Sequence, residues 1–139
     1  MDRGVHILLV EDDLVDQMSV ERAFNRLKIA NPIHVANDGV EALEMLRGEN
    51  GPPIPKPFII LLDWNLPRMP GIEFLQELRS DPELKDSVVF VLTTSKAEED
   101  KAAAYELNVA GYIVKEHVGE QFLNVVTMLG HYWRIVELP

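Results

Sequence analysis

Five short apolar runs, separated by longer segments of mixed polarity, place the strongest restriction on the folds open to this chain. Short runs that are apolar at nearly every position are typical of strands buried on both faces of a parallel sheet. The segments between the runs, and the segment after the last, have helical patterns. Strands that alternate with helices predict a doubly wound α/β fold, with a five-stranded parallel sheet and five helices. The runs cover residues 5–10, 32–36, 58–62, 88–93 and 111–114.

Capping residues indicate where several of the helices begin. Asp38 followed by Glu41, and Ser95 followed by Glu98, have the spacing of a capping box. The Pro- and Gly-rich stretch 48–57 predicts a stiff surface loop, to which we assign no function. The predicted helices cover residues 14–28, 38 onward, 71–80, 95 onward and 119–136.

The length and composition predict one globular domain, residues 1–139. With 47% hydrophobic and 26% charged residues, the chain can bury one substantial core. The net charge of −10 opposes binding to nucleic acid. Cysteine is absent, which excludes disulfides and thiolate metal sites and favours the cytoplasm. No apolar run approaches the length of about 20 residues needed to cross a membrane.

Chemically functional side chains stand at the ends of four of the predicted strands. Parallel strands end at the same edge of a sheet, so we expect these groups to converge. Crowded carboxylates repel one another, and Mg²⁺ with oxygen ligands relieves that repulsion. A hydroxyl and an ammonium group beside the metal can bind phosphoryl oxygens, which predicts phosphoryl transfer. The groups are Glu11 and Asp12 after the first strand, Asp63 after the third, Thr93 in the fourth and Lys115 after the fifth.

Each of these residues also has an ordinary structural explanation. An Asp after a strand is more often a helix cap than a nucleophile. Suitable residues at four strand ends are much harder to explain as caps, and together they favour the functional interpretation. Asp63 is the best candidate for the nucleophile, because it stands alone after the most apolar strand. The histidines show no metal-ligand spacing and receive no role: His6, His34, His117 and His131.

Five segments resemble bacterial response-regulator receiver domains, and together they span nearly the whole chain. Their order and spacing make the match more specific than any one segment. The resemblance implies a flavodoxin-like receiver fold and a phosphorylatable switch, which takes its phosphoryl group from the phosphohistidine of a sensor histidine kinase. The segments are ILLVEDD (7–13), NDGVEAL (37–43), LLDWNLPRMPG (61–71), VFVLTTS (89–95) and AGYIVK (110–115).

The resemblance also implies a role for each acidic residue of the predicted site. Asp63 looks like the phosphoacceptor. Glu11 and Asp12 look like the acidic pair that holds Mg²⁺ together with Asp63, with the backbone carbonyl of Asn65 as a further ligand. A receiver of this kind catalyses only its own phosphorylation and dephosphorylation, and is not an enzyme with an external substrate.

Three further residues match the switch of the family. Thr93 resembles the hydroxyl that moves toward the new phosphoryl group, and Tyr112 resembles the aromatic residue that then turns inward. Lys115 resembles the residue that pairs with the phosphoryl group. The family usually has proline, often after a cis bond, where this chain has Glu116. A cis bond before a non-proline residue costs about 2.5–4 kcal/mol, so either the 115–116 bond is trans or the loop is strained to keep Lys115 directed at the site.

The end of the chain narrows the resemblance. The segment HYWRIVELP (131–139) and the proline-rich insert before the third strand resemble the small receivers that partner bacterial phytochrome histidine kinases. No DNA-binding helices follow the predicted receiver, so we expect a stand-alone module without an output domain. Its effect would come from binding another protein or from drawing phosphate off the kinase.

The last predicted helix has two apolar stripes. The larger stripe packs on the sheet most simply, and the smaller one, formed by Met128, Tyr132 and Ile135, is a candidate homodimer interface. The alternative is that Tyr132 and Ile135 pack on the preceding helix of the same subunit, and the pattern favours neither.

Two other functions compete with the switch. An aspartate-nucleophile phosphohydrolase usually has a second Asp two residues after its nucleophile, where this chain has Asn65, and that nucleophile follows the first strand instead of the third. A receiver-like scaffold that is never phosphorylated is the other alternative, and the complete set of site residues argues against it.

Overall fold

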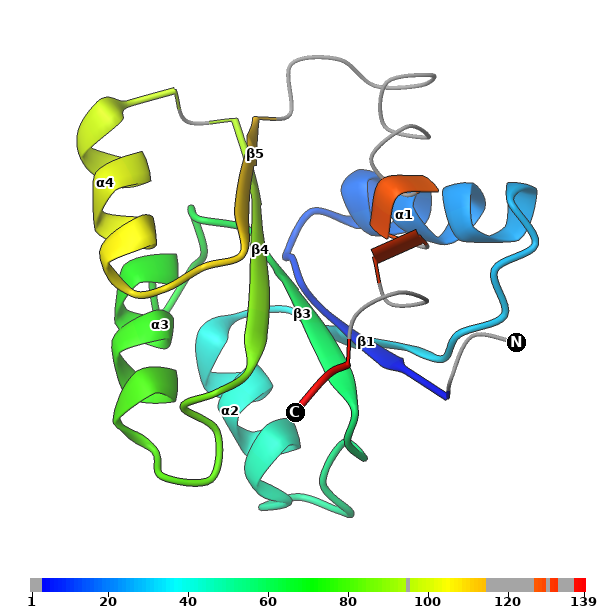
Figure 1. Ribbon diagram of the computed structural model, residues 1–139, viewed down its shortest axis with the longest axis horizontal. Coiled ribbons are helices and arrows are strands. Elements are labelled where there is room, and N and C mark those ends of the chain that lie inside the picture. Colours follow the sequence, from blue (N-terminus) through cyan, green and yellow to red (C-terminus); the bar gives the residue numbers. More distant parts are fainter. Residues whose placement is uncertain (1–3, 95, 115–126, 130, 133–136) are drawn as a thin grey trace.

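A computed structural model describes residues 4–94, 96–114, 127–129, 131–132 and 137–139. A five-stranded sheet in the order β2-β1-β3-β4-β5 forms the middle of the molecule, and every neighbouring pair of strands is parallel (Figure 1). This arrangement confirms the predicted doubly wound sheet. The strands are β1 (His6–Val10), β2 (Ile33–Ala36), β3 (Phe58–Leu62), β4 (Val88–Thr93) and β5 (Gly111–Val114).

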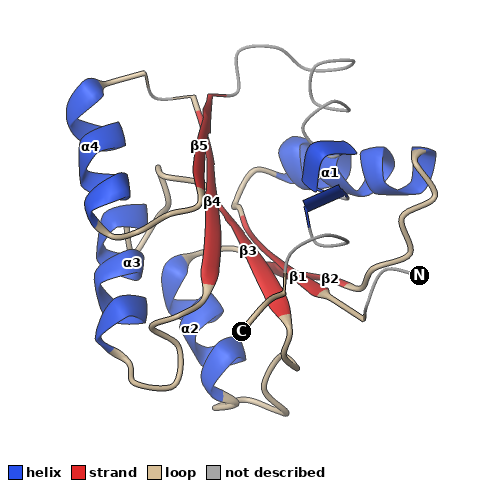
Figure 2. Cartoon of the chain, viewed as in Figure 1, coloured by secondary structure: helices blue, strands red, loops and turns tan. Residues whose placement is uncertain are grey.

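Helices cover both faces of the sheet, and α2, α3 and α4 lie together on one face (Figure 2). On the opposite face lies α1, together with the helical residues 127–129 and 131–132. These residues belong to the predicted last helix, whose other positions lie outside the described residues. The complete helices of the described chain are α1 (Leu14–Arg26), α2 (Gly39–Arg47), α3 (Gly71–Ser80) and α4 (Glu98–Glu106).

The sheet separates two apolar clusters, because successive side chains of a strand point to opposite faces. Leu8 and Ile60 pack with Phe74 of α3 in the first cluster. Ile7 and Ile59 belong to the second, which contains residues of α1 and of the last helical segment. All five residues of β3 are buried. The apolar character of β3 at every position therefore follows from helices on both faces.

The structure corrects two predicted helix boundaries. The first helix ends at Arg26 and not at residue 28, because the chain turns at Lys28 with φ 56°. The fourth begins at Glu98, with Ala97 in the cap position and no side-chain hydrogen bond there. The predicted start at residue 95 is therefore wrong, and Ser95 of the predicted capping box lies outside the described residues. The acidic residues of the first turn still favour this helix through its dipole.

The loop 48–57 is anchored to the domain at two points. Gly48 caps α2 at φ 72°, a conformation that favours glycine, and a Cβ atom there would lie 2.9 Å from Cδ of Pro53. Ile54 is buried, and its N–H donates to the carbonyl of Met45 at 3.2 Å. The predicted surface loop thus contributes one side chain to the core.

In the described part of the chain, no helix is both long enough and apolar enough to cross a bilayer.

Candidate active site

Three carboxylates meet at the carboxyl ends of β1 and β3. Glu11 and Asp12 follow β1 and Asp63 follows β3, and these two strands are neighbours with Val10 opposite Leu62. One carboxylate oxygen from each of the three residues lies within 4.8 Å of the others. Glu11 is buried, Asp63 is half-buried and Asp12 is exposed, so the cluster is open on one side. The predicted convergence of these three residues is confirmed.

The sheet holds the backbone of this cluster in place beyond the last residue of each strand. The N–H of Glu11 donates to the carbonyl of Ala36, and the N–H of Asp63 donates to the carbonyl of Val10, each at 2.9 Å. These bonds continue the pattern of the sheet by one residue. The separation of the carboxylates is therefore set mainly by strand spacing, which is about 4.8 Å in any sheet.

Helix α1 and its cap residue add two contacts to Glu11 that the sequence did not predict. The side-chain amide of Gln17 donates to the backbone carbonyl of Glu11 at 2.6 Å, and the N–H of Asp13 donates to the carboxylate of Glu11 at 3.2 Å. Asp13 itself caps the helix, accepting from the N–H groups of Val15 at 2.8 Å and Asp16 at 3.1 Å. The third acid of the Glu11–Asp13 run is thus a helix cap and lies outside the carboxylate cluster.

The donor set of the cluster suits a hard divalent cation. Three carboxylates this close repel one another, and burial of Glu11 raises the cost of its charge. Oxygen-only ligands, few in number and with one open side, match an ion that keeps several water molecules. Glu11, Asp12 and Asp63 could therefore hold such an ion between them.

The structure places the predicted switch residues on the two strands beyond β3. Thr93 is fully buried at the end of β4, with Val114 opposite it on β5. Tyr112 lies on β5, and its ring meets Trp64 edge-on, with centroids 6.5 Å apart. Lys115, the predicted partner of the phosphoryl group, lies outside the described residues, as does Glu116.

The loop after Asp63 is held close to the site by tight backbone contacts. The N–H of Asn65 faces a carboxylate oxygen of Asp63 at 3.4 Å, and the N–H of Gly71 donates to the carbonyl of Trp64 at 2.9 Å. A Cβ atom at Gly71 would lie 2.9 Å from Cα of Trp64, so any larger residue there would push this loop away. Trp64 is itself buried.

Arg68 ties the same loop to the start of α2 through a bidentate ion pair that the sequence did not predict. Its Nε donates to Oδ2 of Asp38 at 2.7 Å and a terminal nitrogen donates to Oδ1 at 3.1 Å. Asp38 also caps α2 as predicted, accepting from the N–H of Glu41 at 2.8 Å. Burial alone would raise the pKa of Asp38, but the hydrogen bonds from Arg68 and from backbone N–H groups outweigh it and lower the pKa.

Asp38→Asn is expected to lower the free energy of unfolding at pH 7 by about 1 kcal/mol, because Asn keeps the cap but loses the ion pair. The folded-state pKa of Asp38 lies below its ordinary value of 3.8. Its stabilisation is therefore complete above that value and is lost as pH falls through the folded-state pKa. Urea unfolding should show a constant difference between wild type and variant from pH 7 to 5, and a smaller one at pH 3.

Glu73→Gln is the control for this experiment, since Glu73 is an exposed acid in the first turn of α3. We expect it to change stability by less than about 0.5 kcal/mol. A difference between wild type and Asp38→Asn that grew toward pH 3 would contradict the role given to the ion pair.

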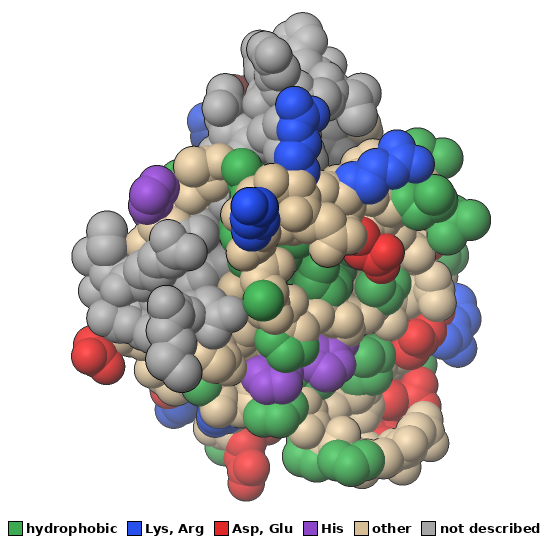
Figure 3. Space-filling model, turned by 90° about the vertical axis from the view of Figure 1, so that its right-hand side faces the viewer, with side chains coloured by type: hydrophobic (Ala, Val, Ile, Leu, Met, Phe, Trp, Pro, Cys, Tyr) green, Lys and Arg blue, Asp and Glu red, His purple; other side chains and the backbone are tan. Residues whose placement is uncertain are grey.

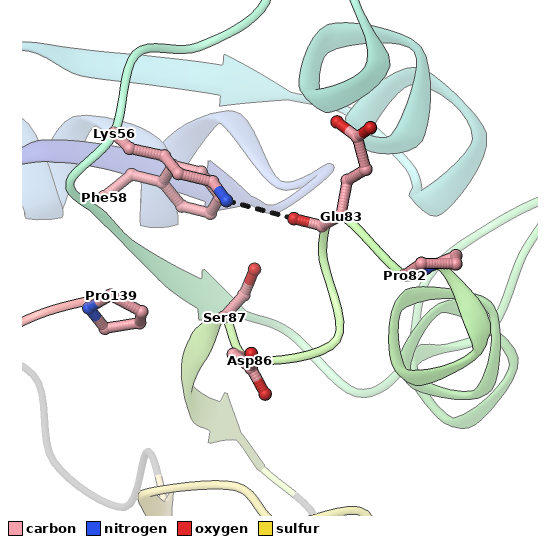
Figure 4. A pocket seen from close by; sticks show the side chains of 7 residues that line it. All are labelled: Lys56, Phe58, Pro82, Glu83, Asp86, Ser87 and Pro139. Atoms are coloured by element: carbon pink, nitrogen blue, oxygen red, sulfur yellow. Dashed lines mark hydrogen bonds between the residues drawn. The ribbon is translucent and has the colours of Figure 1, made fainter.

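A cavity of about 240 Å³ lies at the other edge of the sheet, where β3 begins and the chain enters β4 (Figure 4). Lys56 reaches across it and donates to the carbonyl of Glu83 at 3.1 Å. The cavity lies at the amino ends of the strands, so it takes no part in the carboxylate site. Its lining residues are Lys56, Phe58, Pro82, Glu83, Asp86, Ser87 and Pro139.

Comparison with known proteins decides the family. The response regulator receiver domain matches residues 7–127, which is most of the chain. The chain belongs to this family. Receiver domains are phosphorylated on an aspartate by histidine kinases, bind a divalent metal ion and act as signalling switches. The predicted family and flavodoxin-like receiver fold are confirmed.

The relatives of this receiver include phytochrome response regulators. Response regulator Rcp1 of Synechocystis sp. is 37% identical over 138 residues, covering 96% of this chain and 92% of the relative. The crystal structure of its Mn²⁺-bound form has a TM-score of 0.84 at 37% identity, covering 98% of this chain and 99% of that one. The phosphorylated cyanobacterial phytochrome response regulator RcpA has a TM-score of 0.85 at 35% identity, covering 96% and 97%.

Proposed function

We propose that Asp63 is the aspartate of this receiver that accepts the phosphoryl group, in a Mg²⁺-dependent reaction. The observation that carries the proposal is the meeting of Glu11, Asp12 and Asp63 within 4.8 Å at the carboxyl ends of neighbouring strands. Asp63 is half-buried, so a phosphoryl donor can reach its carboxylate. The hydrogen bond from its N–H to the sheet still fixes its backbone position. Glu11 and Asp12 would hold the metal ion together with Asp63, and the backbone carbonyl of Asn65 would be a fourth ligand.

The transfer needs little from the protein beyond position and charge. A carboxylate oxygen of Asp63 attacks phosphorus and forms the O–P bond of an acyl phosphate, while the P–N bond to the kinase's imidazole breaks. The electron pair of that bond returns to the imidazole nitrogen, which leaves the site. Bound Mg²⁺ supplies positive charge against the oxygens of the phosphoryl group and against the carboxylates. The phosphorylated form returns to the unphosphorylated form by hydrolysis, in which water attacks the phosphorus of the acyl phosphate, inorganic phosphate leaves and the Asp63 carboxylate is restored.

The change of state would pass to the surface through Thr93 and Tyr112. The hydroxyl of Thr93 donates to the new phosphoryl group, and Lys115 pairs with that group's negative charge. Thr93 is fully buried at the end of β4, so movement of its side chain must be matched by its neighbours. The ring of Tyr112 contacts Trp64, which directly follows Asp63 in the chain. Rotation of Tyr112 would thus alter the surroundings of Trp64, and its fluorescence offers a second readout of the switch.

The proposed partner is a sensor histidine kinase of the phytochrome type. RcpA is described as a phytochrome response regulator, and its similarity to this chain extends over 96% of the residues. This chain covers 92% of Rcp1, which supports the proposal that residues 1–139 form a single receiver domain. The net charge of −10 argues against nucleic acid as the direct target.

A homodimer through the last helix also remains a proposal, in a narrower form. Tyr132 packs inside its own subunit against Phe90, with ring centroids 5.2 Å apart at 90°. Phe90 lies on β4. The sequence had allowed packing of Tyr132 on the preceding helix as the alternative to a dimer. Met128 is 42% exposed and remains available for an interface, and Ile135 lies outside the described residues.

Incubation with acetyl phosphate is the direct test of this function. With Mg²⁺ present, intact-mass spectrometry should show one added phosphoryl group that hydroxylamine removes, as it does for an acyl phosphate. Chelation of the metal by EDTA should abolish the adduct, because the three carboxylates then repel the incoming phosphate. An adduct that forms equally well in EDTA, or none under any condition, would reject the proposed reaction. Lack of the adduct together with lack of Mg²⁺ binding would favour the scaffold alternative.

A further inference from the structure

One side chain of α1 joins the turns that follow β1 and β2. The side-chain amide nitrogen of Gln17 donates to the backbone carbonyl of Glu11 at 2.6 Å and to Oδ1 of Asn37 at 3.1 Å. Glu11 follows β1 and Asn37 follows β2, and these strands are neighbours in the sheet. An amide group carries two N–H donors, so one glutamine can serve both acceptors. Gln17 thus bridges two turns at the edge of the sheet where the carboxylate cluster lies.

The bridge adds a restraint to a residue that the backbone already holds. The N–H of Glu11 donates to the carbonyl of Ala36 at 2.9 Å, and the carboxylate of Glu11 accepts from the N–H of Asp13 at 3.2 Å. The carbonyl that Gln17 contacts belongs to the peptide unit between Glu11 and Asp12, and a peptide unit is planar. Holding this plane limits where both carboxylates can lie, including that of the exposed Asp12.

Asn37 connects the bridge to the loop that follows β3. The next residue, Asp38, accepts both hydrogen bonds of the bidentate pair with Arg68, at 2.7 and 3.1 Å. The same loop packs closely on the start of α2, since a Cβ atom at Gly39 would lie 3.0 Å from Cβ of Met69. The turns after β1, β2 and β3 are therefore joined by side-chain contacts outside the carboxylate cluster.

We propose that Gln17 is a positioning residue of the phosphorylation site, which holds Glu11 and Asp12 in the geometry that binds the divalent cation. The inference rests on the metal-binding role proposed for the carboxylate cluster. Without the ion, carboxylates within 4.8 Å of one another repel and move apart wherever the backbone allows it. The bridge forms on folding and resists that movement, so ion binding does not have to restore the geometry.

Helix α1 stays packed on the sheet without help from Gln17. Its residues Val20, Ala23 and Phe24 are buried, in a cluster that also contains residues of β1 and β3. Loss of the half-buried Gln17 amide should therefore lower the midpoint of urea unfolding by less than about 0.7 M. A purely structural role predicts a loss of stability alone, whereas a positioning role predicts weaker metal binding at nearly unchanged stability.

Titration with Mn²⁺, followed by electron paramagnetic resonance of the free ion, tests this role in the full chain. Mn²⁺ prefers oxygen ligands, as Mg²⁺ does. Gln17→Met keeps the length of the side chain but removes both N–H donors, and should weaken Mn²⁺ binding about tenfold. Asn37→Ala should weaken it only about threefold, because Gln17 keeps its bond to Glu11. The double variant should bind no more weakly than Gln17→Met, because Asn37 acts through Gln17.

His34→Leu is the matched control, since it removes another side-chain contact between β1 and β2. Nδ1 of His6 and Nε2 of His34 are 2.9 Å apart, a hydrogen bond near the amino ends of the two strands. Figure 3 shows two histidines side by side on one face of the molecule. The five-residue step from His6 to Glu11 corresponds to roughly 16 Å, so this contact lies away from the carboxylate cluster. We expect the variant to bind Mn²⁺ as tightly as wild type does.

Equal Mn²⁺ affinity in wild type, Gln17→Met and Asn37→Ala would overturn the positioning role. Equal weakening by His34→Leu would also overturn it, because the effect would then follow from stability. Asn37→Ala tests the bridge from its other end without changing α1, in case Gln17→Met fails to fold. If Asp12→Asn weakens binding and Gln17→Met does not, the metal site stands and the bridge has no part in it. A wild type that binds no Mn²⁺ would reject the metal site itself, and the bridge with it.

Discussion

Asp63→Asn is expected to abolish the acetyl-phosphate adduct of this receiver, with a loss of at least about a hundredfold in phosphorylated protein. The amide has nearly the shape of the carboxylate, so the fold and the contact with the N–H of Asn65 at 3.4 Å should persist. It has no negative oxygen to attack phosphorus, and a phosphoryl amide linkage would not form in its place. Intact-mass spectrometry with Mg²⁺, followed by peptide mapping, measures the effect.

Asp13→Asn is the matched control for this variant. It makes the same chemical change on an acidic residue next to the site, but Asp13 caps α1 and Asn caps helices equally well. We expect wild-type phosphorylation and wild-type stability. An adduct that persists in Asp63→Asn at the wild-type level, or that disappears equally in Asp13→Asn, would show that the phosphoacceptor has been assigned wrongly.

Arg79→Ala is expected to have the largest effect on stability, lowering the free energy of unfolding by about 3 kcal/mol. The half-buried guanidinium joins α3 to the two loops that lead into β4 and β5. Burial lowers the pKa of Arg79, because the charged guanidinium loses part of its hydration, and the nearby charge of Asp86 opposes that shift. Removing the side chain takes away the guanidinium donors of four backbone carbonyls, two of them part-buried. They are the carbonyls of Leu107, Lys85 and Ser87 at 2.7 Å and of Asn108 at 3.0 Å.

Urea unfolding at neutral pH measures this loss, and two variants bracket it. Arg47→Ala removes an arginine that only forms ion pairs with Glu77 at 3.6 Å and Asp81 at 3.1 Å on the surface, so it should cost less than about 1 kcal/mol. Arg79→Lys keeps the charge but cannot serve four carbonyls with one ammonium, and should recover less than half of the loss. Equal effects of Arg79→Ala and Arg47→Ala would refute the role assigned to Arg79.

The strands and the core of the candidate site follow from local sequence patterns. The bounds of β3, β4 and β5 match the predicted runs, because a run that is apolar at every position has few alternatives to a buried strand. The meeting of Asp12 with Asp63 was predictable for a related reason. Once the strands are parallel and adjacent, the residues that follow them must lie at one edge.

Helix starts were less predictable, because capping residues are common and their geometry is shared with turns. Asp38 caps α2 as its spacing indicated, whereas the same spacing from residue 95 to Glu98 predicted too early a start for α4, which begins at Glu98. The packing of a helix's apolar residues also decides where that helix can begin. The four residues of a capping motif carry no information about this packing.

By itself, the sequence determined the order of elements, the parallel sheet and the acidic residues that follow β1 and β3, since all of these depend on short-range patterns repeated along the chain. Only the tertiary structure decided which other distant side chains meet, away from the ends of the strands. The pair His6–His34, the ion pair Arg68–Asp38 and the Arg79 contacts join residues that are 28, 30 and up to 29 positions apart. Such contacts depend on strand register and on how a loop packs, and neither leaves a periodic signal in the sequence.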